Sequence, residues 1–244
     1  MSAHTDEDFR MLKLEHITKT YRTTDVETLA LDDVCLSVNR GEFLAIMGPS
    51  GCGKSTLLNI LGLVDGPSSG AYWFFGEDVA RCSEEGLTLH RRAGVGFVFQ
   101  SFNLINDLNV AENVEVALIY RHVPRHERRK RVEAALEKVG LAHRAKHMPQ
   151  QLSGGQQQRV AVARALVSDP KIILADEPTG NLDTANGDAV MEMLRRINAS
   201  GTTLIMVTHS EVHAARADRI VRMLDGRLTD DASEEVEATD ALGV

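Results

Sequence analysis

The chain has 244 residues, of which 43% are hydrophobic and 25% are charged, and its net charge is −8. This length fits one domain, or one domain with an insert, and the composition is typical of a globular protein with a substantial core. The acidic balance argues against a nucleic-acid-binding protein, which would normally present a basic surface. No apolar run approaches the ~18 residues needed to cross a bilayer.

The amino-terminal segment MSAHTDEDFR is polar and acidic, so it resembles neither a signal peptide nor a transit peptide. The three cysteines, Cys35, Cys52 and Cys82, are widely spaced and odd in number, which indicates reduced thiols in a cytosolic setting. We therefore expect any role at a membrane to come through a partner.

The first hundred residues are rich in strand patterns. MLKLEHI and VCLSV alternate between apolar and polar residues, which predicts half-buried strands, and EFLAIMG is a continuous apolar run typical of a central buried strand. A helix is expected to begin near Lys54, in STLLNILG. AYWFFG and VGFVFQ are two further candidate strands.

From about residue 101 to 150 the pattern becomes helical. Asn109 and Glu112 form a plausible capping pair before VEVALIY, and ERRKRVEAALEKVG has helical periodicity with Gly140 as its stop. Strand-like runs return at IILAD and LIMVTH, with AVMEMLRRINASG as a helix between them. The basic run in ERRKRVEAALEK is interspersed with glutamates, which favours a solvated helix face over a nucleic-acid or lipid surface.

Residues 48–55, GPSGCGKS, match G-x-x-x-x-G-K-S between an apolar strand and a helix, the context that this phosphate-binding loop requires. The glycines let backbone N–H groups turn inward around phosphate oxygens, and the helix N-terminus adds its positive dipole end. Lys54 would reach the β- and γ-phosphates, and the Ser55 hydroxyl would bind Mg²⁺. The nucleotide-binding candidates here are Gly48, Pro49, Ser50, Gly51, Cys52, Gly53, Lys54, Ser55 and Thr56.

Two adjacent carboxylates follow a second buried strand in IILADE. Asp176 lies at the carboxyl end of that strand, where an acid can hold Mg²⁺ beside the phosphate loop. Glu177 follows directly and could orient or deprotonate the attacking water. Strand–helix alternation around a phosphate loop indicates an α/β fold with a parallel core, and the helical stretch is then an inserted subdomain.

The motifs GPSGCGKS, LSGGQ, ILADEPTGNLD and VTHS, in this order, resemble those of the ATP-binding cassette ATPases over about residues 12–228. GLVDGPSSG, FVFQSFNLINDLNVAENVE and GNLD are closest to the branch that serves lipoprotein release and macrolide export. The resemblance implies ATP hydrolysis with Mg²⁺ on a P-loop NTPase core. It also implies an N-terminal antiparallel β subdomain.

The resemblance also implies roles for single residues. Gln100 is similar to the glutamine that senses Mg²⁺ and water and links the core to the helical insert, and Asp183 matches the D-loop. His209 matches the switch histidine that contacts the γ-phosphate and Glu177, while Tyr21 matches the aromatic residue that stacks on adenine. A lone tyrosine after a strand is often only an edge residue. Ser210 departs from the family pattern, which very often has aspartate after the histidine.

LSGGQ forms a second candidate anion site. Ser153 is a good helix N-cap, Gly154 and Gly155 expose backbone N–H groups, and a helix follows from Gln156. The family resemblance implies that Ser153, Gly154, Gly155 and Gln156 contact the far side of a nucleotide held by a second copy of the chain.

Together these patterns predict a single nucleotide-binding domain over residues 11–228. Its core would span 11–100 and 157–228, its helical insert about 101–156, and its flexible tails 1–10 and 229–244, the second of which includes DDASEEVEATD. The resemblance implies a homodimer on the cytoplasmic face of the inner membrane, driving an integral membrane permease that docks near Gln100 and the insert. An importer ATPase, or a soluble cassette ATPase of DNA repair or translation, is the alternative. The single cassette, compact insert and acidic charge favour the transporter class, with no nucleic-acid partner.

Overall fold

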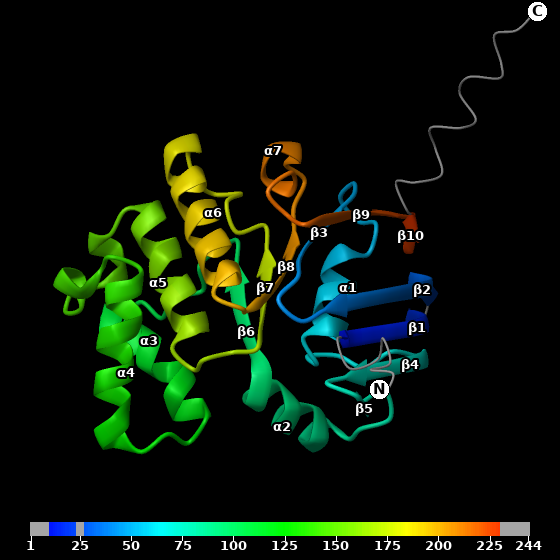
Figure 1. The fold of residues 1–244 in the computed structure, drawn as a ribbon, viewed down its shortest axis with the longest axis horizontal. Helices are drawn as coiled ribbons and strands as arrows, with labels where there is room; N and C mark the ends of the chain where they lie inside the picture. The colour runs from blue at the N-terminus through cyan, green and yellow to red at the C-terminus, as the bar shows by residue number, and fades with distance from the viewer. Residues whose placement is uncertain (1–9, 23–26, 230–244) are drawn as a thin grey trace, which may run out of the picture.

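The computed structural model describes residues 10–22 and 27–229, and Figure 1 shows their fold. Its helices are α1 (Lys54–Leu61), α2 (Glu84–Gly94), α3 (Val110–Tyr120), α4 (Arg125–Lys138), α5 (Gly154–Leu166), α6 (Thr184–Ala199) and α7 (Glu211–Ala214), with short 3₁₀ turns at Ala142–Arg144 and Pro149–Gln151. None of these helices has the length and apolar character needed to cross a bilayer.

The strands form two sheets. The antiparallel sheet has the order β2 (Glu27–Asn39), β1 (Arg10–Arg22), β4 (Ser69–Phe74), β5 (Glu77–Asp78). The second sheet has the order β10 (Arg227–Thr229), β9 (Arg219–Leu224), β3 (Phe43–Met47), β8 (Thr203–Val207), β7 (Ile172–Asp176), β6 (Val95–Phe99), and its strands are parallel except for β10. The expected α/β fold with an N-terminal antiparallel subdomain is confirmed.

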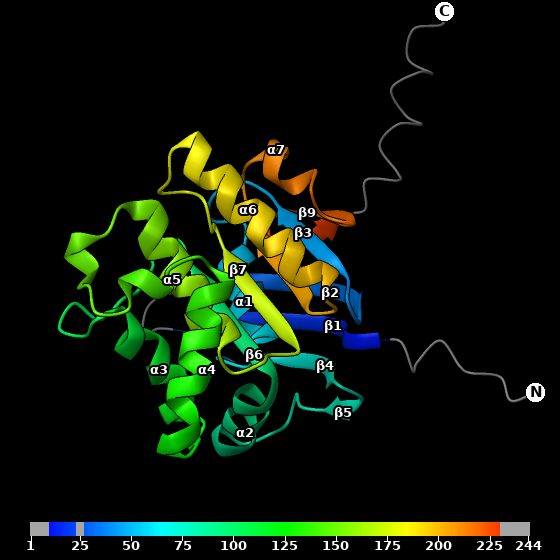
Figure 2. The ribbon, with the colours of Figure 1, turned by 60° about the vertical axis from the view of Figure 1, so that its left-hand side comes forward.

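The central strands are buried on both faces, so alternate residues enter different cores. In β3, Leu44 and Ile46 pack in the core that contains α1 and the antiparallel sheet, whereas Phe43 and Ala45 pack with the helices on the opposite side. This two-sided burial explains why EFLAIMG is apolar without a break. Figure 2 shows the resulting layers, with the helical part on one side and the antiparallel sheet on the other.

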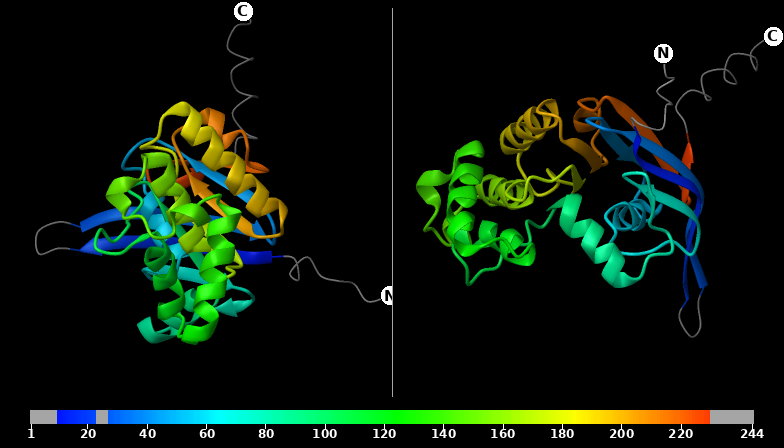
Figure 3. Two further views of the ribbon diagram at one scale, coloured as in Figure 1. Left: turned by 90° about the vertical axis from the view of Figure 1, so that its left-hand side faces the viewer. Right: turned by 60° about the horizontal axis from the view of Figure 1, so that its bottom comes forward.

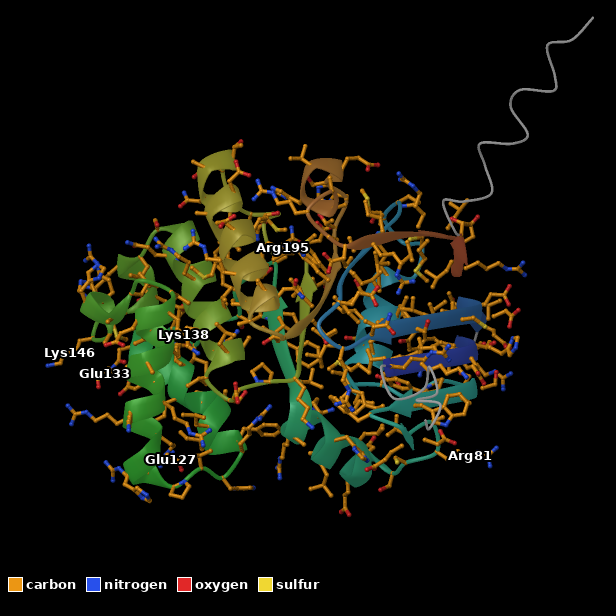
Figure 4. The ribbon with its side chains drawn as sticks, viewed as in Figure 1. Arg81, Glu127, Glu133, Lys138, Lys146 and Arg195 are labelled. Atoms are coloured by element: carbon orange, nitrogen blue, oxygen red, sulfur yellow. The ribbon has the colours of Figure 1, made fainter. Side chains whose placement is uncertain are left out.

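The described secondary structure between residues 101 and 156 consists of α3, α4, the two 3₁₀ turns and the start of α5, as expected from the helical pattern. Asn109 and Glu112 form a reciprocal capping box at the start of α3, and Gly140 adopts a φ of 71° just beyond the end of α4. Glu127 pairs with Arg131 at 2.6 Å, and Glu133 and Lys138 are exposed, so the basic run is a solvated face (Figure 4). The right-hand view of Figure 3 shows this helical part beside the core.

The expected tails lie almost entirely outside the described residues. β1 begins at Arg10 and β10 ends at Thr229, so these two residues belong to strands rather than to flexible segments. Residues 1–9 and 230–244, including DDASEEVEATD, are not described.

Sequence reasoning did not identify α2, β5, α7 or the β9–β10 hairpin. The hairpin turns at Asp225 and Gly226, whose φ values are 47° and 80°. An Asp-Gly pair with both residues at positive φ is a strong hairpin signal, so this element was detectable from the sequence.

Candidate functional site

The loop after β3 is built to enclose an anion. Gly51 and Gly53 have φ values of 81° and 106°, in the left-handed region that side chains avoid. A Cβ at Gly53 would also lie 2.5 Å from the backbone oxygen of Ala30. Lys54 begins α1, and its ammonium donates to the backbone oxygens of Gly48 and Pro49 at 2.8 and 2.7 Å, which holds it within the loop.

Four parallel strands bring the remaining candidates to the same edge of the sheet. In the strand order β3, β8, β7, β6, the register pairs Asp176 with Val207 on one side and with Phe99 on the other. Gln100, Glu177 and His209 therefore follow neighbouring strand ends and meet the loop after β3. This is the edge at which open α/β sheets bind ligands.

These residues line one cleft of about 540 Å³. Its volume is within the range of cofactor sites. The predicted residues that line it are Gly48, Ser50, Gly51, Gly53, Lys54, Ser55, Thr56, Gln100, Asp176, Glu177 and His209.

Burial raises the pKa of the Asp176 carboxyl, the charge of Glu177 raises it further, and only Lys54 opposes them. The protein therefore provides too little positive charge to balance the ionised Asp176 carboxylate. A cation next to Asp176 and the exposed Ser55 would relieve this imbalance, so the donor set fits Mg²⁺, which prefers oxygen ligands. In the part of the chain that is described, no cluster of three or more His, Cys, Asp or Glu side chains could hold a metal alone, so phosphate oxygens would complete such a site.

Glu177 and His209 are in direct contact. Oε1 of Glu177 lies 2.8 Å from Nδ1 of His209, with the Glu177 side chain largely buried and the His209 ring 71% exposed. Glu177 has a φ of 46°, and its backbone N–H donates to Val207. The backbone of Glu177 is thus fixed by β8 while its carboxylate faces the cleft.

Gln100 is linked to the loop that follows Glu177. Its side-chain amide lies 3.3 Å from Oδ1 of Asn181, and the Asn181 amide donates to the backbone oxygen of Gln100 at 3.1 Å. A Cβ at Gly180 would lie 2.7 Å from the Gln100 amide nitrogen, so a larger residue at this position would displace the Gln100 side chain.

The structure does not bring every candidate to the cleft. Ser153 caps α5 through a capping box with Gln156, and Asp183 caps α6 by accepting from Asn186 at 2.9 Å. Gly155 contacts Asn186, so the starts of these two helices pack together. The predicted residues outside the cleft lining are Tyr21, Pro49, Cys52, Ser153, Gly154, Gly155, Gln156 and Asp183.

Tyr21 and Ser210 have other partners in this structure. The Tyr21 hydroxyl donates to Asp65 at 3.0 Å, and the ammonium of Lys19 lies 5.0 Å from the centre of its ring. Ser210, the departure from the family pattern, caps α7 by accepting from the backbone N–H of His213. Serine therefore supplies the helix cap that aspartate would otherwise provide.

Val207 of β8 lines the cleft without having been predicted as a site residue, and so do three residues of β2, Thr28, Leu29 and Ala30. Leu29 is 52% exposed, which is unusual for a large apolar side chain in a strand. No sequence motif marks the β2 residues, because only the packing of the antiparallel sheet against the phosphate loop places them here.

The chain is similar to known proteins over most of its length. Residues 31–180 match the family model described as ABC transporter. The chain is 49% identical over 91% of its length to the macrolide export ATP-binding/permease protein MacB of Azoarcus sp., and it spans only 34% of that relative. It is 47% identical over 89% of its length to the ABC transporter ATP-binding protein YknY of Bacillus subtilis and spans 95% of it.

Solved structures agree with these matches. A dimeric structure of the ATP-binding cassette MJ0796, in a post-hydrolysis state with ADP and Pi bound, is 45% identical with a TM-score of 0.82, covering 89% of this chain and 96% of that one. cbiO1 of Clostridium perfringens, part of the ABC transporter complex cbiONQ, is 33% identical with a TM-score of 0.81, covering 91% of this chain and 87% of that one.

Proposed function

Because the chain belongs to the ABC transporter family of ATP-hydrolysing proteins, we propose that it forms a dimer around two ATP molecules. This dimer drives a separate membrane permease. The proposal rests on the observation that the predicted nucleotide-binding residues lie in two separate places on the chain. Lys54, Asp176 and Glu177 line one cleft, whereas the second candidate anion-binding helix start, at Ser153, lies outside that cleft in the same chain.

The cleft residues have different roles in binding the nucleotide. Backbone N–H groups of the loop after β3 hold the phosphates, Lys54 neutralises the β- and γ-phosphate charge, and Ser55, Asp176 and Gln100 would hold Mg²⁺. Mg²⁺, when bound, supplies charge stabilisation at the phosphate oxygens. Tyr21 is proposed to stack on the adenine.

Hydrolysis requires a water molecule in line with the bond that breaks. Glu177 is the group placed to hold such a water and to accept its proton, since its carboxylate lines the cleft next to Asp176. His209 fixes that carboxylate through the 2.8 Å contact and presents its exposed ring to the cleft. Gln100 contributes to the same site from the neighbouring strand.

A second copy would complete the site. The helix start is exposed at Ser153 and half-buried at Gly154 and Gln156, whereas Gly155 is buried against Asn186. Asp183 caps the neighbouring helix α6. ATP would contact the phosphate loop of one chain (residues 48–55) and the helix start at Ser153 of the other chain. ADP lacks the γ-phosphate that both of these segments would contact. ATP therefore favours the closed dimer and hydrolysis favours its opening.

The partner is proposed to be an integral permease of the lipoprotein-release or macrolide-export type, with this chain bound peripherally at the cytoplasmic face of the inner membrane. The identity to MacB, a combined ATP-binding and permease protein, supports this choice. The docking site is proposed to be the groove between β6 and the helical insert, next to Gln100.

The test is affinity purification of the tagged Glu177→Gln chain from detergent-solubilised membranes in ATP and Mg²⁺, with identification of the proteins that copurify. Recovery of a permease with few spans and a large extracytoplasmic domain is the expected result. Recovery of a many-span importer permease would overturn the export-type assignment, and recovery of ribosomal or DNA-associated proteins alone would overturn the transport role.

A further inference from the structure

The loop between β7 and α6, residues 177–183, carries Glu177 and is folded into two consecutive turns. The backbone N–H of Gly180 donates to the backbone oxygen of Glu177 at 3.0 Å. The backbone N–H of Leu182 donates to the backbone oxygen of Thr179 at 3.0 Å. Each bond closes a four-residue turn, and the two turns share residues. The position of Thr179 therefore constrains the position of Glu177.

Thr179 is hydrogen-bonded to the helix that follows His209. Its side-chain hydroxyl lies 2.8 Å from Nδ1 of His213, which belongs to α7. Thr179 is 7% exposed, so water has little access to this hydrogen bond. Because α7 begins two residues after His209, the bond joins the segment that carries Glu177 to the segment that carries His209.

The helix α6 packs against this pair, and α6 and α7 lie side by side (Figures 1 and 2). A Cβ at Gly187 of α6 would lie 3.6 Å from Cβ of Thr179 and 3.7 Å from Cε1 of His213, which is ordinary van der Waals contact. A separate ion pair joins Arg216, just beyond α7, to Asp188 of α6. Of these two polar contacts, only the one between Thr179 and His213 reaches the loop of residues 177–183.

The same two segments also meet at the cleft, through the 2.8 Å contact between Glu177 and His209. The His209 ring is 71% exposed, and an exposed pair contributes little to holding two segments together. The hydrogen bond between Thr179 and His213 lies in a less polar environment, where hydrogen bonds are electrostatically stronger. Of the two contacts, it is therefore the one better able to fix the distance between the segments.

The imidazole of His213 is mainly neutral at pH 7 because of its surroundings. Burial lowers its pKa, and the charge of Arg216 lowers it further, as does His209. The charges of Asp188 and Glu177 oppose this lowering without reversing it. A neutral imidazole can form a hydrogen bond at Nδ1 without placing a positive charge near Glu177.

We propose that Thr179 and His213 form a positioning pair. The pair holds Glu177 and His209 at the separation that hydrolysis requires. Neither Thr179 nor His213 lines the nucleotide cleft, so the pair acts through the two cleft residues and not on the nucleotide. The inference rests on the proposed function, because it uses the roles given there to Glu177 and His209. Breaking the pair should slow the chemical step while leaving nucleotide binding intact.

A double-mutant cycle tests the pair. Thr179→Val removes the hydroxyl and keeps the branched shape, and His213→Leu removes the ring nitrogens. Steady-state ATP hydrolysis by the purified chain with Mg²⁺, at about pH 8 where histidine is neutral, gives kcat and KM. Each single variant should lower kcat about tenfold and change KM less than about twofold, because a small displacement of reacting groups affects the transition state most. The double variant should lose about as much kcat as one single variant, because both changes remove the same bond.

Conservative substitutions should preserve the rate. Thr179→Ser keeps the hydroxyl and His213→Asn places an amide near the position of Nδ1, so both should retain kcat within about twofold. Arg216→Leu is the matched control, because it breaks the other contact of α7 and leaves the bond to the loop in place. It should lower the melting temperature while retaining kcat. His213→Leu changes a partly exposed position and gives the comparison by itself if Thr179→Val does not fold.

The inference is overturned by an unchanged kcat in Thr179→Val and His213→Leu, by additive losses in the double variant, or by an equal loss of kcat in Arg216→Leu. Equal losses in Thr179→Ser and Thr179→Val would overturn it as well. Glu177→Gln is measured in the same assay, and hydrolysis at the unchanged rate by this variant would contradict the proposed function. A slow Glu177→Gln chain, together with an unchanged kcat in Thr179→Val and His213→Leu, rejects the positioning pair alone.

Discussion

Nδ1 of His209 lies 2.8 Å from Oε1 of Glu177, although the two residues are 32 positions apart in the chain. The contact joins the ends of β7 and β8, and it leaves the exposed imidazole facing the same cleft as Lys54.

His209→Ala should lower kcat for ATP hydrolysis by about 100-fold, the typical contribution of a positioned acid–base partner. Phosphate release measures the rate, and binding of a fluorescent ATP analogue is the control, which should change little because Lys54 and the loop remain. An unchanged kcat would show that the contact with Glu177 is only structural.

Glu177→Gln should form a stable dimer in ATP and Mg²⁺, visible by size-exclusion chromatography, because hydrolysis no longer opens it. The matched control adds Ser153→Asp, which keeps the helix cap but places a negative charge against the phosphate. That double variant should elute as a monomer. A monomeric Glu177→Gln chain at saturating ATP would contradict the two-site sandwich.

Asp176→Asn should stabilise the nucleotide-free chain at pH 7. Burial and then the charge of Glu177 raise the pKa of the Asp176 carboxyl above 3.8, so the folded state binds the carboxyl proton more tightly than the unfolded state does. The stability of the folded chain therefore falls as pH rises from the unfolded pKa through the raised folded pKa. Because the carboxyl is only partly buried, we expect a gain of about 1–3 °C in melting temperature. The gain should vanish below the unfolded pKa, and Mg²⁺–ATP should stabilise the variant less than the parent.

Gly155→Ala should destabilise the nucleotide-free chain by about 1–3 kcal/mol, because its Cβ would lie 2.2 Å from Oδ1 and 2.9 Å from Cβ of Asn186. Gly154→Ala is the matched control, since its Cβ would meet nothing closer than 3.6 Å, at Leu182. Urea denaturation compares the two variants. Equal stability would show that the starts of α5 and α6 do not pack as described.

Tyr21→Ala should weaken ATP binding about three- to tenfold if the ring stacks on adenine, whereas Tyr21→Phe should keep most of the affinity. Fluorescent-nucleotide titration distinguishes them. Equal loss in both variants would assign the contribution to the hydroxyl bond with Asp65 instead of the ring.

Much of the fold was predictable from local pattern because its determinants are local. The apolar run of β3, the glycines of residues 48–55 and the Asn109–Glu112 box each specify their own segment, and the structure confirms those elements. α2 was missed although its sequence is amphipathic, with Ser83 as N-cap and Glu84 and Glu85 in its first turn, so this helix was detectable from the sequence.

The residue types of the site were likewise identified from motifs, but their assembly was not. Gln100, Asp176 and His209 meet because β6, β7 and β8 are neighbours in a parallel sheet, and such pairing depends on contacts far apart in the chain. The same holds for Leu29, which β2 brings to the cleft. The sequence alone determined which groups are available for chemistry, whereas only the tertiary structure decided which of them share a cavity, because side-chain proximity across a sheet follows from strand order and not from sequence spacing.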